Sequence, residues 1–168
     1  MTKEESKPIR GSGAGSLNIR PKIGARDHSK DELEEISKLL DQGLSSKVDS
    51  RLRALIKSTR ADISLIARAC CVLSKSLEMQ GRYRESLEAI VMYETPESRS
   101  GLNAEALSCI RVQIGLAYNY TGDHPKAIAL LNAALKAAAE NDSDAQVGWV
   151  YVALARVYRN LNEYTIAT

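Results

Sequence analysis

From residue 29 onwards, apolar residues recur at intervals of three and four, the period of an amphipathic helix. Two such stripes predict a pair of helices before residue 60: Leu33, Ile36, Leu39 and Leu40, then Val48, Leu52, Leu55 and Ile56. Ser29 and Glu32 have the spacing of a capping box, which predicts that the first helix begins at Ser29. Gly43 is its predicted end, because glycine readily takes the left-handed conformation that closes a helix. No segment has the alternation of a strand followed by its turn, so the sequence predicts an all-α fold.

The rest of the chain repeats one pattern of small, large and turn residues. A small residue stands at Ser74, Gly115 and Ala155, at intervals of 41 and 40 residues. A large residue follows on the same helical face, at Leu77, Tyr118 and Tyr158. A residue type that tolerates positive φ is the predicted end of each of these helices, at Gly81, Gly122 and Asn162. A second small residue comes soon afterwards, at Ser86, Ala127 and Ala167.

Each repeat therefore predicts a hairpin of two antiparallel helices. In the middle repeat, Asp123 is expected to cap the second helix, and Pro125 lies in its first turn, where a missing amide costs little. A buried stripe continues that helix through Leu130, Leu131, Ala134 and Leu135. Hairpins repeated at a near-constant interval are expected to stack into an α-α superhelix.

The N-terminal segment has a different composition. The first thirty residues hold seven Lys and Arg against three Asp and Glu, and four of the ten Gly of the chain. Few large apolar residues lie there, so the segment cannot offset an ordering entropy of about 1–2 kcal/mol per residue. Residues 1–28 are therefore predicted to be a disordered basic arm. A plain leader is the simpler interpretation, and a docking arm for an acidic partner is the alternative.

Composition argues against several functions. The chain of 168 residues has the length of one domain, and its net charge of +2 is too small to indicate a nucleic-acid or membrane surface. No apolar run approaches the roughly 18 residues of a membrane-spanning helix. Cys70, Cys71 and Cys109 form neither a disulfide framework nor a metal motif, which favours a reducing, cytoplasmic location. Nucleophilic catalysis at His28 or His124 is not supported by the residue pattern. We predict no catalytic residue, metal or cofactor, and no enzymatic activity.

The repeats resemble the tetratricopeptide repeat (TPR) family. The middle repeat carries most of the signature, at Gly115, Tyr118, Gly122, Ala127, Ala134 and Leu135. The first repeat is a weaker match, because Ser74 and Ser86 stand where the family has Gly and Ala. The interval of 40–41 residues exceeds the family's usual repeat of about 34 and is similar to its long-repeat type. We assign repeats to residues 61–100, 101–141 and 142–168, the last one truncated. Residues 29–60 are either a degenerate leading repeat, which we favour, or a capping hairpin.

The resemblance implies a concave groove lined by the first helix of each repeat, which is the usual ligand surface. The polar and aromatic residues at those positions are Arg68, Lys75, Glu78, Gln113, Asn119, Tyr120, Trp149, Arg156, Arg159 and Asn160. Smaller or apolar positions between them include Cys71, Val72, Met79, Cys109, Val112, Leu116, Val152 and Ala153. Four cations against one anion predict a positive groove, and Arg forks bind carboxylates. Trp149, the only tryptophan, either anchors a partner or packs between repeats.

The resemblance therefore implies a non-enzymatic protein-binding module, such as an adaptor or scaffold, whose groove holds an acidic peptide or a neighbouring domain. The alternative is an N-terminal regulatory or sensor domain of a larger signalling or transcription-regulatory protein, controlling an output domain. We expect no direct binding of nucleic acid or membrane. Because the third hairpin is predicted to be unfinished at Thr168, we also expect its uncapped helix to be covered by further chain, a partner or a second copy in a homodimer.

Overall fold

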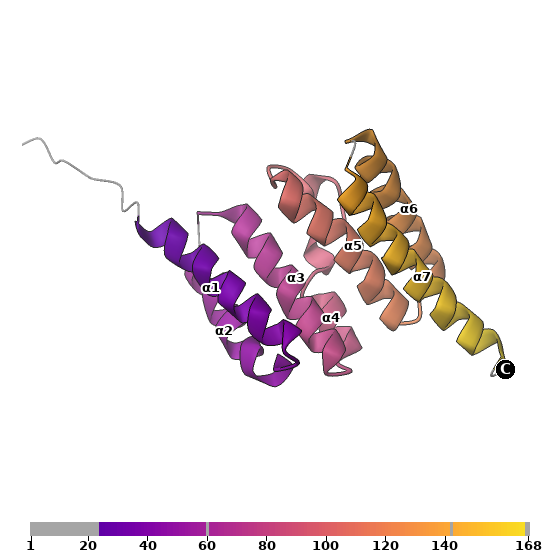
Figure 1. Cartoon of the computed structure of the whole chain (residues 1–168), viewed down its shortest axis with the longest axis horizontal. Coiled ribbons are helices and arrows are strands. Elements are labelled where there is room, and N and C mark those ends of the chain that lie inside the picture. The colour runs from indigo at the N-terminus through magenta and orange to yellow at the C-terminus, as the bar shows by residue number, and fades with distance from the viewer. Residues whose placement is uncertain (1–23, 60, 142, 167–168) are drawn as a thin grey trace, which may run out of the picture.

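A computed structural model of the chain describes residues 24–59, 61–141 and 143–166, and every regular element in these ranges is helical (Figure 1). The helices are α1 (Gly24–Asp41), α2 (Ser45–Ser58), α3 (Ile63–Met79), α4 (Tyr83–Glu88), α5 (Ala104–Tyr120), α6 (His124–Glu140) and α7 (Asp144–Ile166). Two 3-10 helices, η1 (Val91–Tyr93) and η2 (Glu97–Arg99), lie between α4 and α5. Residues 1–23 of the predicted arm and Ala167 lie outside the described residues.

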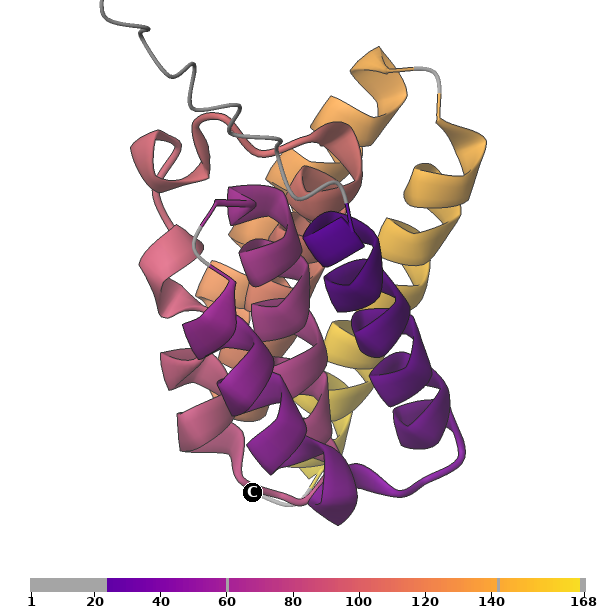
Figure 2. The same cartoon turned by 90° about the vertical axis from the view of Figure 1, so that its left-hand side faces the viewer.

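The helices form a curved stack. Each helix packs against a neighbour in sequence, and α1 with α3, α3 with α5, and α5 with α7 are also in contact. The stack runs from α1 to α7 along its long axis (Figure 1), and both of these end helices are displaced to the same side of α3 and α5 (Figure 2). The predicted all-α superhelix of hairpins is confirmed, with α1/α2, α3/α4 and α5/α6 as its hairpins.

Helix α3 joins two hydrophobic clusters because it is apolar on two faces. One face carries Leu65, Ala69, Leu73 and Leu77, which are buried against the apolar stripes of α1 and α2. The opposite side contributes Ala67, Cys70 and Cys71 to a larger cluster built mainly from α5, α6 and α7. The core is therefore distributed along the stack, as expected when each hairpin buries its apolar surface against the next.

The predicted turns are largely present. Gly43, Gly81 and Gly122 have φ of 81°, 73° and 89°, the left-handed region that favours glycine. Asp123 caps α6 by accepting a hydrogen bond from the Lys126 amide at 3.1 Å. The capping box predicted at Ser29 is wrong, because α1 begins at Gly24 and Ser29 lies inside it.

The small residues of the pattern lie where the two helices of a hairpin touch. In the α5/α6 hairpin, a Cβ atom on Gly115 would lie 2.7 Å from Cγ of the fully buried Leu131. In the α3/α4 hairpin, the buried hydroxyl groups of Ser74 and Ser86 form a hydrogen bond of 2.8 Å. Close approach of helix backbones is therefore the role of these positions in both hairpins, as predicted, whereas the equivalent Ala155 of the third repeat is exposed on α7.

The predicted turn at Asn162 is wrong, because α7 continues without a break to Ile166. Glycine enters the left-handed region at little cost, whereas asparagine pays a steric penalty there and can stay in the helix. With α7 continuous, no second helix of this repeat covers it among the described residues. Tyr158 is 49% exposed, whereas the equivalent residues Leu77 and Tyr118 are 0% and 8% exposed.

The contact between Gly115 and Leu131 can be tested by substituting glycine with alanine. Alanine favours a helix over glycine by up to about 1 kcal/mol, yet the new methyl group has no room here. We expect Gly115→Ala to lower the free energy of unfolding by about 1–3 kcal/mol, the usual cost of overpacking. Urea denaturation followed by circular dichroism measures the change.

Gly148 provides the matched control. It also lies in a helix, α7, but a Cβ atom added there meets nothing within 4 Å. Gly148→Ala is expected to leave the stability unchanged or raise it by up to about 1 kcal/mol. Equal effects at the two glycines would contradict the close-packing role of Gly115.

Candidate functional site

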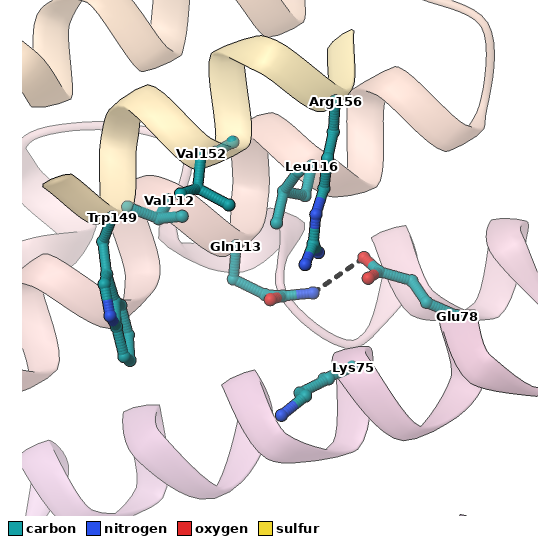
Figure 3. A pocket seen from close by; sticks show the side chains of 9 residues that line it. Lys75, Glu78, Val112, Gln113, Leu116, Trp149, Val152 and Arg156 are labelled. Carbon is teal, nitrogen blue, oxygen red and sulfur yellow. Dashed lines mark hydrogen bonds between the residues drawn. The ribbon is translucent and has the colours of Figure 1, made fainter. Parts of the chain in front are cut away.

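A pocket of about 300 Å³ opens between α3, α5 and α7. It is lined by Lys75 and Glu78 from α3, Val112, Gln113 and Leu116 from α5, and Trp149, Val152, Ala153 and Arg156 from α7 (Figure 3). The first helices of three consecutive repeats therefore build it together. All nine residues are among the positions expected to line the groove.

The pocket has an apolar wall and a polar end. Trp149 and Val152 are 63% and 55% exposed, so they offer apolar surface to solvent, and the buried Val112 and Leu116 lie behind them. Trp149 does not pack inside the core, which argues against the packing interpretation, and its role as an anchor for a partner stays a prediction. Arg156 reaches from α7 towards the polar end (Figure 3).

Glu78 is held at this polar end by neutral hydrogen-bond donors. Its Oε1 accepts a 2.7 Å bond from Gln113 Nε2 (Figure 3) and a 3.2 Å bond from Ser86 Oγ. Gln113 Nε2 also donates to Ser74 Oγ at 3.1 Å. The network joins α3, α4 and α5. Burial raises the pKa of Glu78 to about 7, although these donors and the charges of Arg156 and Lys75 act in the opposite direction.

The cations of the site differ in their pairing. The ammonium group of Lys75 lies 3.0 Å from Asp41 of α1, and the guanidinium group of Arg68 lies 3.1 Å from Glu105 of α5. The expected excess of four cations is therefore reduced by two carboxylates that the sequence did not bring into the site. Arg156 and Arg159 remain exposed on α7 and contribute most of the positive charge.

Comparison with family models agrees with this architecture. Residues 106–167, which cover nearly all of α5, α6 and α7, match the model described as tetratricopeptide repeat. Residues 106–167 therefore carry the tetratricopeptide repeat pattern. TPR proteins are modules of protein–protein interaction, and their repeats are typically non-enzymatic. Comparisons with curated proteins and with solved structures gave no match.

Not every residue carried over from the TPR pattern lies on the groove surface. Asn119 is 2% exposed, and its Oδ1 lies 3.1 Å from Nδ1 of His124, so its assignment as a peptide contact is wrong. It precedes the turn into α6 and is enclosed by that helix. Tyr120 is half-buried and stacks on Tyr83 of α4, with ring centroids 5.2 Å apart. Arg159 and the half-buried Asn160 lie farther along α7 and do not line the pocket.

The serines that fix Glu78 were missed as functional residues. Ser74 and Ser86 replace the Gly and Ala of the TPR pattern, and each brings a hydroxyl group into the hairpin crossing. The signal was present in the sequence, because two polar residues at two packing positions require mutual partners when buried. In the sequence analysis, these two serines indicated only a weaker match of the first repeat to the TPR pattern.

Cys109 differs from the other two cysteines, which are buried. A hydrogen bond from Cys71, together with the nearby charge of Arg68, lowers the pKa of the Cys109 thiol to about 7. Burial raises the pKa of Cys71, and it raises that of Cys70 to about 11. Cys71 of α3 and Cys109 of α5 are therefore in contact across the two helices.

Within the described residues, no cluster of three His, Cys, Asp or Glu side chains is arranged to bind a metal ion. In the same residues, no helix combines the length and the apolarity needed to cross a membrane.

The thiols provide a test of these local environments. Cys109 is partly exposed and about half ionised near pH 7, whereas its neighbours are buried and protonated. We expect iodoacetamide at neutral pH to alkylate Cys109 at least about tenfold faster than Cys70 or Cys71, as followed by peptide mass spectrometry. Labelling of all three at one rate in the native protein would contradict the assignment.

Proposed function

We propose that this TPR protein binds an extended acidic segment of a partner protein in the groove formed by α3, α5 and α7. The pocket carries the proposal, because first helices from three repeats contribute to one surface that is apolar on one side and positively charged at one end. A buried core helix would not expose a tryptophan and a valine beside arginine in this way.

The surface fits a segment in which acidic and apolar residues alternate. In an extended chain, successive side chains point to opposite sides. Apolar side chains of such a segment would pack against Trp149 and Val152, while its carboxylates would bind Arg156 and Arg159. Guanidinium groups bind carboxylates through paired hydrogen bonds, which are stronger than those between neutral groups. The rigid helices present this surface without folding on binding, which limits the entropy cost of association.

Two further predictions concern the context of the module. A regulatory domain in a larger protein would use the same groove for a segment of its own output domain. A homodimer would instead use the exposed face of α7 that includes Tyr151 and Tyr158, which are 57% and 49% exposed. Both remain predictions, and the partner-binding groove is the function that the arrangement of residues supports best.

Charge reversal tests the groove. We expect the double variant Arg156→Glu, Arg159→Glu to bind a synthetic peptide of alternating Asp and Leu at least about tenfold more weakly than the parent protein. Each hydrogen bond to a charged group contributes about 1.5–3 kcal/mol, and about 1.4 kcal/mol corresponds to a tenfold change in affinity. Isothermal titration calorimetry measures the affinity, and fluorescence of Trp149 reports on the pocket itself.

Lys136→Glu is the matched control, because Lys136 is a highly exposed cation on α6 that does not line the pocket. It should bind the peptide within about twofold of the parent, since exposed charges contribute about 0–1 kcal/mol. Circular dichroism checks that the variants remain helical. Unchanged affinity of the double variant, or equal binding of a peptide with Asn in place of Asp, would refute the proposal.

A further inference from the structure

Glu78 is a carboxyl group in a site proposed for carboxylates. It lines the same pocket as Arg156 and Lys75, and it is the one acidic residue among the nine that do so. Glu78 accepts hydrogen bonds from the amide of Gln113 and the hydroxyl of Ser86, which carry no charge. The network of Ser74, Ser86 and Gln113 fixes the carboxyl group in the pocket, so it cannot simply turn away when a ligand enters.

The charged and titratable groups around Glu78 come from several helices. Lys75 lies one turn before it on α3, and Arg156 faces it from α7. Tyr120 of α5 is close enough for the charges of Glu78, Arg156 and Arg159 to act on its pKa, which burial raises. Tyr83 of α4 stacks on that ring. The surroundings thus hold two nearby cations, of which Lys75 is already paired with Asp41 of α1, a third cation beyond them, and the carboxyl group of Glu78.

The protonation of Glu78 is balanced near neutral pH. Burial raises its pKa to about 7, well above the usual value near 4.3, so about half of the free protein carries the neutral acid at pH 7. A second carboxylate brought into the pocket would repel the ionised form and leave the neutral form unaffected. The neutral acid can also donate a hydrogen bond to the incoming carboxylate, which the ionised form cannot do.

We propose that the pocket takes a ligand carboxylate against Arg156 only when Glu78 is a neutral acid, so that binding takes up a proton from solution. This inference rests on the proposed function and adds a chemical condition to it. The proton comes from water or buffer and stays on the Glu78 carboxyl group, and no covalent bond changes. The cations of the pocket then bind the ligand carboxylate without competition from Glu78.

The expected pH dependence follows from the fraction of neutral Glu78. The fraction of the free protein in which Glu78 is neutral falls from about nine tenths to about one tenth as the pH rises from about 6 to about 8. The apparent affinity for the peptide falls in the same proportion. We expect the parent protein to bind the alternating Asp and Leu peptide about tenfold more weakly at the higher pH. The Asp residues of the peptide stay ionised throughout this range, because their pKa is near 3.9.

Calorimetry in two buffers with different ionisation enthalpies tests the proton directly. At neutral pH the parent protein should take up about half a proton for each peptide bound, the amount missing from Glu78 in the free protein. Glu78→Gln keeps an oxygen that accepts from Gln113 but cannot titrate. This variant should bind the peptide with no proton uptake at Glu78 and with similar affinity at both pH values. Because it retains Cys109, it also separates Glu78 from the thiol that titrates in the same range.

Glu88→Gln is the matched control, since Glu88 is an exposed carboxylate on α4 outside the pocket and should keep the tenfold pH dependence. Peptide binding without proton uptake, or a pH dependence that survives Glu78→Gln, would overturn this inference and leave the proposed function in place. Absence of binding to both the parent and Glu78→Gln at either pH would overturn the proposed function and this inference with it.

Discussion

The close approach of two helices within each hairpin is the constraint on which the remaining structure depends. Gly115 brings α5 against Leu131 of α6 with no space for a methyl group. At the same position of the preceding hairpin, Ser74 meets Ser86 through a hydrogen bond. The pair of serines has a consequence for the groove. Buried hydroxyl groups need hydrogen-bond partners, and the network around these two hydroxyl groups extends to Gln113 and Glu78. A packing position of the repeat thereby places a carboxyl group in the pocket.

Features that depend on local chemistry could be predicted from the sequence. Gly81 and Gly122 mark helix ends, because few other residues take a positive φ cheaply. Asp123 caps α6 through a bond to an amide three residues away. The groove positions on α3, α5 and α7 were implied by the resemblance to the TPR family, and the pocket brings together nine of them. In each case the information lies within one hairpin or in its repetition.

Features that depend on distant or competing contacts could not be predicted in the same way. Asn162 is compatible with both a helix end and a helix interior, and in the structure it lies in the interior of α7. Asn119 occupies a groove position in the repeat pattern, yet α6 encloses it beside His124. Lys75 is paired with Asp41, 34 residues earlier, which requires knowing how α1 packs on α3. The sequence therefore led us to expect more unpaired positive charge in the groove than the structure shows. Arg156 and Arg159 of α7 were among the cations expected there, and they remain exposed.

The division of the core at α3 has a consequence for how the molecule opens. The cluster that holds α1 and α2 is separate from the one that holds α5, α6 and α7, and α3 contributes to both. In linear arrays each unit is stabilised by its neighbours, so the terminal hairpin can detach at a fraction of the global unfolding free energy. Fraying of α1 and α2 would leave the walls of the pocket standing and would release Lys75 from Asp41. The stability of the first hairpin thus sets how often the groove acquires one more unpaired ammonium group.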